Sequence, residues 1–337
     1  MNEKLKAGVL GGTGYVGQRL ITLLHDHPYF DVKVIAASER SAGKSYYDAV
    51  KGKWKLSQGI PDNIGPMVVK DLHNIDEISN EVDFVFCAVD MPANEIREIE
   101  ENYAKSETPV VSNNSAHRLT PDVPIIIPEV NPEHLYIIEK QRKRLGTSRG
   151  FIVTKPNCSI QSYVPAINAL MDFRPSMLSV CTYQAISGSG KTFADWPEMI
   201  DNVIPFIPGE EEKSEQEPLK VWGHINGDEI VKAYEPVITA QCIRVSAAEG
   251  HLAAVSVSFK HRPSMETIID CWKNYKGKPH LLKLPTAPKQ FLTYFSENNR
   301  PQTRLDREAE NGMGITLGRL REDNIFDYKF VCLSHNT

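Results

Sequence analysis

The chain has 337 residues, of which 41% are hydrophobic and 24% charged, and its formal net charge is −5. This length predicts about two domains, each able to bury a core. The apolar fraction excludes an intrinsically disordered chain, and 21 glycines, 22 prolines and 6 cysteines exclude collagen-like and disulfide-rich scaffolds. The acidic balance gives no electrostatic reason to expect nucleic acid or an anionic membrane as a partner.

Apolar runs are only a few residues long, so we expect neither a membrane span nor a signal peptide. The six cysteines are scattered, with no CxxC pair and no histidine at metal-ligand spacing, so we expect no metal site. Unpaired cysteines are typical of a reducing compartment, and we therefore expect a cytoplasmic protein.

The first part of the chain alternates short apolar runs with amphipathic stretches. Strands are predicted at residues 5–10, 32–37, 83–89, 109–112 and 151–154. Helices are predicted at residues 16–24, 93–105 and 133–144. Continuous apolar strands that alternate with helices predict a parallel sheet covered on both faces.

The second half contains β-branched runs with partial alternation of apolar and polar residues. Strands are predicted at residues 177–183, 237–245, 252–259, 315–320 and 328–333. Helices are predicted at residues 159–171, 210–222 and 265–274. This pattern predicts an antiparallel or mixed sheet with helices on one face. Together, the two halves predict an α/β nucleotide-binding domain followed by an α+β domain.

A glycine-rich loop follows the first predicted strand. Gly12, Gly14 and Gly17 form a GxGxxG pattern that ends a strand and opens a helix, which is the context a dinucleotide site requires. Glycines let the backbone approach a pyrophosphate closely, and the helix N-terminus supplies free N–H groups and a positive dipole. We therefore expect a bound dinucleotide rather than an empty turn.

The end of the second strand bears on which dinucleotide binds. Residues 38–41 read Ser-Glu-Arg-Ser, and Lys44 follows. Hydroxyls and cations suit a 2′-phosphate, whereas a carboxylate suits the ribose hydroxyls of NAD. NADP is favoured, and Glu39 keeps NAD open.

Cys158 is the candidate nucleophile. It follows the strand at residues 151–154, and we expect it in the first turn of the next helix, where the helix dipole favours the thiolate. A free cysteine is more often a small buried apolar residue, but a dinucleotide loop in the same chain favours aldehyde chemistry through a thioester. His251, at the mouth of a predicted strand, is the candidate general acid/base.

Seven motifs, in order along nearly the whole chain, resemble those of aspartate-semialdehyde dehydrogenases, most of all the archaeal and fungal branch. They are Gly-Gly-Thr-Gly-Tyr-Val-Gly (11–17), Ser-Glu-Arg-Ser-Ala-Gly-Lys (38–44), Pro-Asn-Cys-Ser (156–159), Gln-Ala-Ile-Ser-Gly-Ser-Gly (184–190), Glu-Glu-Glu-Lys (210–213), Arg-x6-His (244–251) and Arg-Pro-Gln-Thr-Arg-Leu-Asp-Arg (300–307). The resemblance implies NADPH-dependent reductive dephosphorylation of L-aspartyl 4-phosphate to L-aspartate 4-semialdehyde, on the route to lysine, methionine and threonine.

The same resemblance implies a fold similar to glyceraldehyde-3-phosphate dehydrogenase. A Rossmann-like NADP-binding domain would occupy residues 1–156, and an α+β catalytic and dimerisation domain residues 157–337. A homodimer or homotetramer is expected. A C-terminal helix that returns to the first domain is also expected from the family, and this sequence does not contain it.

Site residues follow from the resemblance position by position. Cys158 would be acylated, His251 would be the general acid/base, and Gln184 would orient the acyl-enzyme. Substrate would be bound by Arg244 through its α-carboxylate, Glu210 through its ammonium, Lys213 and Arg118 through the phosphate, and by Asn113. NADP would contact Gly12, Thr13, Gly14, Tyr15, Val16, Ser38, Arg40, Ser41, Ser187 and Gly188.

Two other functions stay open. A malonyl-CoA reductase on the same fold would keep Cys158, His251 and NADPH while using a thioester substrate. Residues 185–192 also fit a loose P-loop pattern, in which a nucleotide-binding module would use Lys191 and would not need Cys158. The P-loop is disfavoured because it lies in the second domain and no downstream strand ends in Asp.

Overall fold

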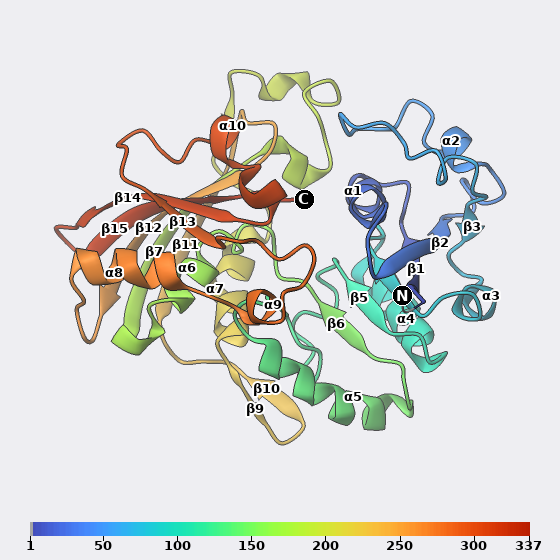
Figure 1. Cartoon of the computed structure of the whole chain (residues 1–337), viewed down its shortest axis with the longest axis horizontal. Coiled ribbons are helices and arrows are strands. Elements are labelled where there is room, and N and C mark those ends of the chain that lie inside the picture. The colour runs from blue at the N-terminus through green and yellow to red at the C-terminus, as the bar shows by residue number, and fades with distance from the viewer. Residues whose placement is uncertain (1–2) are drawn as a thin grey trace. The chain divides into compact units, whose positions relative to one another are not determined.

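The computed structural model describes residues 3–337, and its chain forms two compact units (Figure 1). The first comprises the chain up to Ile125, His134–Lys155 and Ile225–Ile230. The second comprises Ile126–Glu133, Pro156–His224 and Val231–Thr337. The chain passes between the units next to the boundary expected after residue 156, and each unit also takes in short segments from elsewhere in the sequence. No helix within residues 3–337 has both the length and the apolar content needed to cross a membrane.

The first unit is built on a six-stranded parallel sheet in the order β3-β2-β1-β4-β5-β6. Its strands are β1 (Leu5–Leu10), β2 (Phe30–Ala37), β3 (Lys70–Asp71), β4 (Phe84–Cys87), β5 (Val110–Ser112) and β6 (Ile152–Thr154). The order reverses at β1, where Leu10 pairs with Ala36 of β2 on one side and Cys87 of β4 on the other. Dinucleotides bind beside such a reversal, at the carboxyl ends of the strands.

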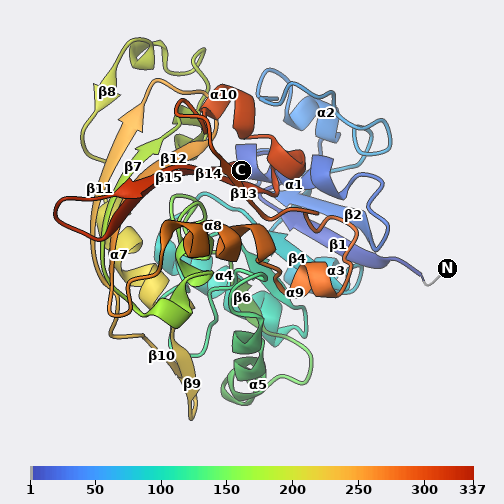
Figure 2. The same ribbon diagram turned by 60° about the vertical axis from the view of Figure 1, so that its left-hand side comes forward.

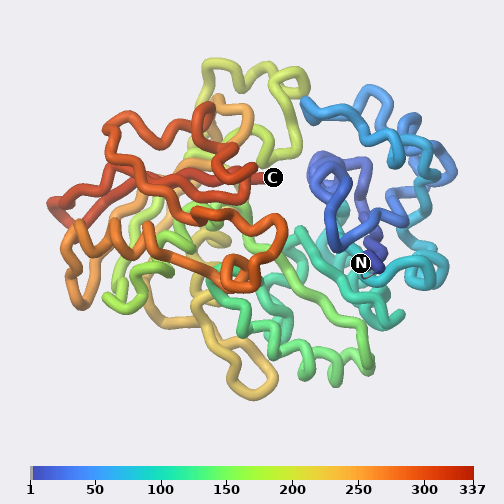
Figure 3. The backbone as a smooth tube through the Cα atoms, viewed as in Figure 1, coloured from blue at the N-terminus to red at the C-terminus, as the bar shows by residue number. Residues whose placement is uncertain are grey.

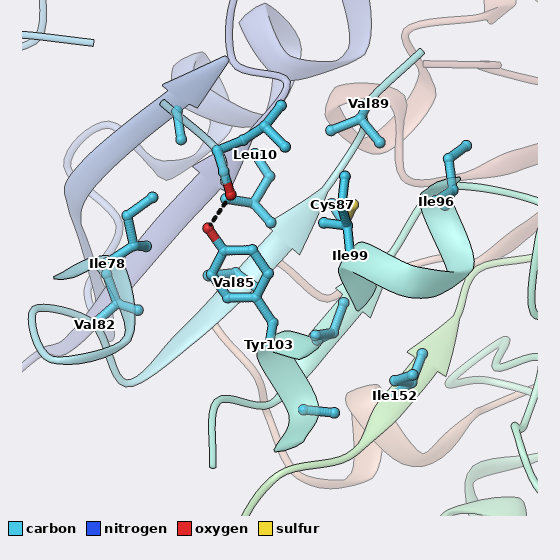
Figure 4. Packing of buried hydrophobic residues seen from close by; sticks show 14 of the residues in the cluster. Leu10, Ile78, Val82, Val85, Cys87, Val89, Ile96, Ile99, Tyr103 and Ile152 are labelled. Carbon is cyan, nitrogen blue, oxygen red and sulfur yellow. Dashed lines mark hydrogen bonds between the residues drawn. The ribbon is translucent and has the colours of Figure 1, made fainter. Parts of the chain in front are cut away.

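Helices accompany this sheet, and an apolar cluster lies on each of its faces. The helices are α1 (Tyr15–Leu24), α2 (Tyr46–Ala49), α3 (Ile75–Ser79), α4 (Ala93–Lys105) and α5 (Ile138–Leu145), the last preceded by a 3-10 turn at Pro132–Ile137. Figure 4 shows Ile99 and Tyr103 of α4 packed toward Leu10 and Val85 of the sheet. Neighbouring strand residues belong to the opposite cluster with Ile21 of α1. The predicted parallel sheet covered on both faces is confirmed.

The second unit contains a seven-stranded mixed sheet in the order β13-β14-β15-β12-β7-β11-β8. Its strands are β7 (Pro175–Gln184), β8 (Val203–Ile204), β11 (Val237–Val245), β12 (His251–Phe259), β13 (Leu292–Phe295), β14 (Ile315–Glu322) and β15 (Tyr328–Ser334). The pairs β11–β7 and β13–β14 are parallel, while the others are antiparallel. The prediction of a mixed sheet in this half is therefore confirmed.

Helices cover one face of this mixed sheet, as Figure 2 shows. They are α6 (Val164–Asn168), α7 (Glu210–Val221) and α8 (Met265–Asn274). Smaller elements are α9 (Lys278–Leu281), α10 (Thr303–Asp306), the paired strands β9 (His224–Asn226) and β10 (Glu229–Val231), and 3-10 turns at Met171–Phe173, Ile186–Ser189, Pro197–Met199 and Ala309–Gly312. Between β7 and α7 the chain makes the long excursion drawn in yellow-green at the top of Figure 3.

Candidate active site

Cys158 and His251 come together in the second unit although 93 positions separate them. The Sγ of Cys158 lies 3.3 Å from Nε2 of His251. His251 is fully buried at the start of β12, and its Nδ1 accepts the backbone N–H of Ala185 at 3.1 Å. Because Nδ1 is an acceptor, the proton of the neutral ring sits on Nε2 and faces the sulfur.

The turn that carries Cys158 differs from the predicted one. The expected helix at residues 159–171 was wrong at its start, because α6 begins only at Val164 and residues 158–163 form turns. The Oδ1 of Asn157 accepts both the backbone N–H of Ser159, at 2.8 Å, and its hydroxyl, at 2.6 Å. Such local side-chain bonds compete with helical ones. Cys158 therefore lies ahead of the helix, outside its first turn.

The positive charge near the thiol of Cys158 comes from Arg244 and not, as expected, from a helix dipole. Arg244, near the end of β11, is buried, and its Nη1 donates to the carbonyl of Ala185 at 2.7 Å. Burial lowers the pKa of its guanidinium, while the nearby Cys158 and Glu210 act to raise that pKa. Since a guanidinium keeps its proton in proteins, Arg244 favours the thiolate form of Cys158.

The backbone at Gly188 lies directly against the guanidinium of Arg244 and the ring of His251. A Cβ at this position would come within 2.8 Å of Nη1 of Arg244 and 2.9 Å of Nε2 of His251. Only glycine permits such an approach without displacing its neighbours. The 3-10 turn at Ile186–Ser189, which follows β7, therefore forms one wall of the site.

Glu210 connects two of the predicted site residues, Gln184 and Lys213, with Asn157. Its Oε1 accepts from Nδ2 of Asn157 and from Nζ of Lys213, both at 3.0 Å, and its Oε2 accepts from Nε2 of Gln184 at 3.3 Å. The side chain is buried at the first residue of α7, while Glu212 two positions later is exposed. Acidic residues at a helix start are usually solvated, so the inward position of Glu210 could not be read from its type.

Two residues that the sequence analysis missed join this site. Asn157 contacts Glu210, as described, and is marked in the sequence only by its place next to Cys158. Asn336 lies beyond β15, and its Oδ1 accepts the backbone N–H of Gly250 at 2.7 Å while its Nδ2 donates to Oγ of Ser187 at 2.9 Å. Asn336 carried no sequence signal, since both partners are remote along the chain.

The P-loop alternative gains no support from the structure. A P-loop needs a strand, a phosphate-binding loop and then a helix. The segment after Gly190 forms turns, and the Nζ of Lys191 lies 4.5 Å from the ring centroid of Trp196. Lys191 thus stacks on an aromatic ring instead of facing a nucleotide loop.

In the first unit, the glycine loop has the shape that a pyrophosphate requires. A Cβ at Gly17 would meet the carbonyl of Gly11 at 2.2 Å, and one at Gly12 would meet the side chain of Ile35 at 2.5 Å, so both positions need glycine. Gly14 is exposed and forms the N-cap of α1 with no side-chain cap and no acidic residue in the first turn. Thr13 and Val16 are half-buried and Tyr15 is buried. The N-terminus of α1, which has no side-chain cap and no acidic residue, fits a phosphate group.

The other predicted residues of the first unit gather at the carboxyl ends of its strands. Ser38 and Arg40 are exposed after β2, in a turn where Ser41 donates its N–H to the carbonyl of Ser38 at 2.9 Å. After β5, Nη2 of the buried Arg118 donates to the carbonyl of Asn113 at 2.9 Å. These groups suit phosphate, as expected from their types.

The chain is similar to known proteins over nearly its whole length. Residues 6–138 match the family described as "Semialdehyde dehydrogenase, NAD binding domain", and residues 167–337 match "Semialdehyde dehydrogenase, dimerisation domain". Aspartate-semialdehyde dehydrogenase of Schizosaccharomyces pombe is 44% identical over 340 residues, covering 98% of this chain and 93% of its own. That of Archaeoglobus fulgidus is 42% identical over 336 residues, covering 99% and 94%. A crystal structure of the Candida albicans aspartate semialdehyde dehydrogenase with NADP has a TM-score of 0.89 at 38% identity, covering 99% and 94%.

Proposed function

Because the chain belongs to the aspartate-semialdehyde dehydrogenase family, we propose that it converts L-aspartyl 4-phosphate to L-aspartate 4-semialdehyde with NADPH and releases phosphate. This is a step toward lysine, methionine and threonine. The observation that carries the proposal is the 3.3 Å pair of Cys158 and His251, with the charge of Arg244 beside it.

NADPH is the proposed cofactor, and when bound it supplies the hydride that takes the thioester to the aldehyde level. The open N-terminus of α1 and the basic turn after β2 support this choice, as does the NADP in the Candida relative. The residues proposed to hold it are Gly12, Thr13, Gly14, Tyr15, Val16, Ser38, Arg40 and Ser41 in the first unit and Ser187 and Gly188 in the second.

Substrate recognition is assigned to the charged residues of the site. Arg244 has five N–H donors, of which Ala185 takes one, so the guanidinium keeps a fork for the α-carboxylate. A carboxylate offers about four lone-pair sites, and three donors already reach Glu210, which leaves one for the substrate ammonium. Lys213, Arg118 and Asn113 bind the phosphate, and Gln184 orients the acyl group.

Cys158 performs the covalent step. Its thiolate attacks the carbonyl carbon of the acyl phosphate, the bond from that carbon to the phosphate oxygen breaks, and phosphate leaves with the electron pair. The Nε2–H of His251 holds the thiolate before the attack. The same proton stabilises the sulfur again when it separates from the aldehyde carbon.

The assembly is a homodimer or a tetramer built from such dimers. Within residues 3–337, the helices α6, α7 and α8 lie on one face of the mixed sheet (Figure 2). On its strands, Met177, Tyr183 and Val237 are 49%, 36% and 65% exposed, and Val237 pairs with Met177. Large exposed apolar patches mark interaction sites, and the matched family description names a dimerisation domain. Light scattering of the purified protein measures the mass directly.

A cytoplasmic location is proposed from the thiol chemistry. None of the six cysteines is in a disulfide within residues 3–337, and Cys158 must stay reduced to act. Reducing compartments keep such thiols available.

The reaction is tested in the reverse direction by nicotinamide absorbance. Purified protein is mixed with NADP and aspartate semialdehyde, with and without phosphate, and phosphate-dependent formation of NADPH is expected. The Cys158→Ser variant should be inactive. If the unmodified protein forms no NADPH in this assay but oxidises NADPH in the presence of malonyl-CoA, the proposed function is wrong and the protein is a malonyl-CoA reductase.

A further inference from the structure

The turn that carries Cys158 has no helix or strand of its own to hold it. Residues 155–157 belong to no regular element, and residues 158–163 form turns. The backbone N–H of Asn157 donates to Oε2 of Glu217 at 2.6 Å. Glu217 is only 2% exposed, so this is a buried hydrogen bond to a carboxylate, the strong kind. We define the nucleophile turn as residues 156–159.

A single face of α7 makes three contacts with this turn. Glu210 accepts from the side chain of Asn157, the hydroxyls of Ser214 and Ser159 lie 3.2 Å apart, and Glu217 accepts the backbone N–H of Asn157. Residues 210, 214 and 217 are spaced by four and three positions, so they project from the same side of the helix. Three residues on one side of α7 therefore hold the nucleophile turn together.

A proline in α7 leaves a helix carbonyl to bond with a residue beyond the nucleophile turn. Pro218 lies inside the helix and has no N–H to donate to the carbonyl of Ser214 four positions earlier. That carbonyl accepts the hydroxyl of Tyr163 at 2.7 Å instead. Tyr163 ends the run of turns that begins at Cys158, so α7 contacts the chain on both sides of Cys158 and again at the end of the run.

The adjacent face of α7 is bonded to the strand that carries Arg244. Oε1 of Glu211 accepts the backbone N–H of Cys242 at 3.2 Å, and Oε1 of Glu215 accepts that of Ala240 at 3.0 Å. Both acceptors reach β11. The helix thus contacts the nucleophile turn and β11 through two different sets of residues, and the Glu211 and Glu215 bonds reach β11 without touching the turn.

We propose that Glu217 is a positioning residue, which holds the nucleophile turn so that Cys158 meets His251 and Arg244. The proposal rests on the nucleophilic role of Cys158 in the proposed function. Of the three contacts, that of Glu217 is the one made to the backbone, at the N–H of the residue immediately before Cys158. Its loss therefore frees the main chain itself and leaves a buried N–H without its acceptor.

The test compares Glu217→Ala and Glu217→Gln with the matched control Glu215→Ala. Glu215 lies on the same helix and also accepts a backbone N–H, but that of Ala240 in β11. Each protein is alkylated with iodoacetamide, and peptide mapping gives the rate constant at Cys158, with Cys158→Ser as the background. Stability is measured by urea unfolding, and kcat and KM by the reverse reaction.

Glu217→Ala should slow alkylation of Cys158 and lower kcat, each by about tenfold, because misplacing a reacting group by about 1 Å costs up to about 100-fold. Glu217→Gln, whose amide oxygen still accepts the N–H, should stay within about threefold and keep the pH profile of alkylation. Glu215→Ala should lose stability as Glu217→Ala does, yet alkylate at the unmodified rate.

Three results would overturn the proposal. These are an unchanged or faster rate in Glu217→Ala, an equal loss in Glu217→Gln, and an equal loss in Glu215→Ala. Alkylation needs neither substrate nor cofactor, so it reports on Glu217 even if the substrate is not aspartate semialdehyde. Failure of the unmodified protein to oxidise the semialdehyde would count against the proposed function alone.

Discussion

Replacing Gly188 with alanine places a methyl group against the two groups that flank Cys158. The new Cβ would lie 2.8 Å from Nη1 of Arg244 and 2.9 Å from Nε2 of His251, whereas ordinary contact begins at 3.4 Å. To reach ordinary contact distances, the guanidinium of Arg244 and the ring of His251 must each move by about half an ångström. Both neighbours are tied to Ala185, one through its N–H and the other through its carbonyl, so a shift strains one of these bonds.

The size of the effect follows from that shift. A displacement of about 1 Å at a reacting group costs up to about 100-fold, so half of it should lower kcat by about tenfold, or ~1.4 kcal/mol of transition-state stabilisation. A fall in kcat at constant KM would identify His251 as the group that moves. A rise in KM for the semialdehyde would identify Arg244.

The assay is steady-state kinetics of the reverse reaction, with urea unfolding to show that the variant is folded. Gly59→Ala is the control, because Gly59 is exposed and its Cβ would meet nothing within 4 Å. That variant should behave like the unmodified enzyme. If kcat and KM of Gly188→Ala both stay within about twofold, the wall formed by Gly188 does not constrain the catalytic groups and the reasoning fails.

Three further predictions concern Arg244, Arg40 and Glu100. Arg244→Lys should raise KM for the semialdehyde about tenfold, because an ammonium cannot replace the planar fork that binds a carboxylate; initial rates at varied semialdehyde will show it. Arg40→Ala should raise KM for NADP about tenfold and leave any activity with NAD unchanged, since only NADP carries the 2′-phosphate. Burial raises the pKa of Glu100 above its ordinary value, against the hydrogen bonds of Ser112 and Asn114 that lower it. The stability that Glu100 contributes is therefore present below its unfolded-state pKa and lost as pH rises through the folded one, so Glu100→Gln should lose less stability between pH 5 and pH 8 in urea unfolding; an equal loss in both proteins would contradict this.

Local sequence patterns predicted much of the secondary structure because they depend on neighbours in the chain. Residues 93–105, 237–245 and 265–274 form α4, β11 and α8 with the predicted bounds. The order of the six parallel strands reverses at β1, the strand that precedes the glycine-rich loop, and this is where a dinucleotide is expected to bind. Periodicity of apolar residues reports burial directly, so it works where packing is apolar.

The same patterns failed where polar groups are buried. Helix α1 buries Gln18, whose amide donates to the carbonyls of Thr13 and Lys53, while the apolar Leu23 of the same helix is 44% exposed. The helix expected at 159–171 lost its first turn to the side-chain bonds of Asn157. A polar side chain can be buried once a partner satisfies it, and sequence does not name that partner.

By itself the sequence determined most of the helices and strands and the glycine-rich loop. It also predicted a nucleophilic Cys158 in a dinucleotide-binding protein. Each of these depends on residues that are neighbours in the chain. Only the tertiary structure decided which carboxylates of α7 are buried against the nucleophile turn. Glu210 and Glu217 face the nucleophile turn, while Glu212 is exposed to solvent, and nothing in their types distinguishes them. Glu217 reaches Asn157 across 60 positions, and packing of a helix against a distant turn sets that contact.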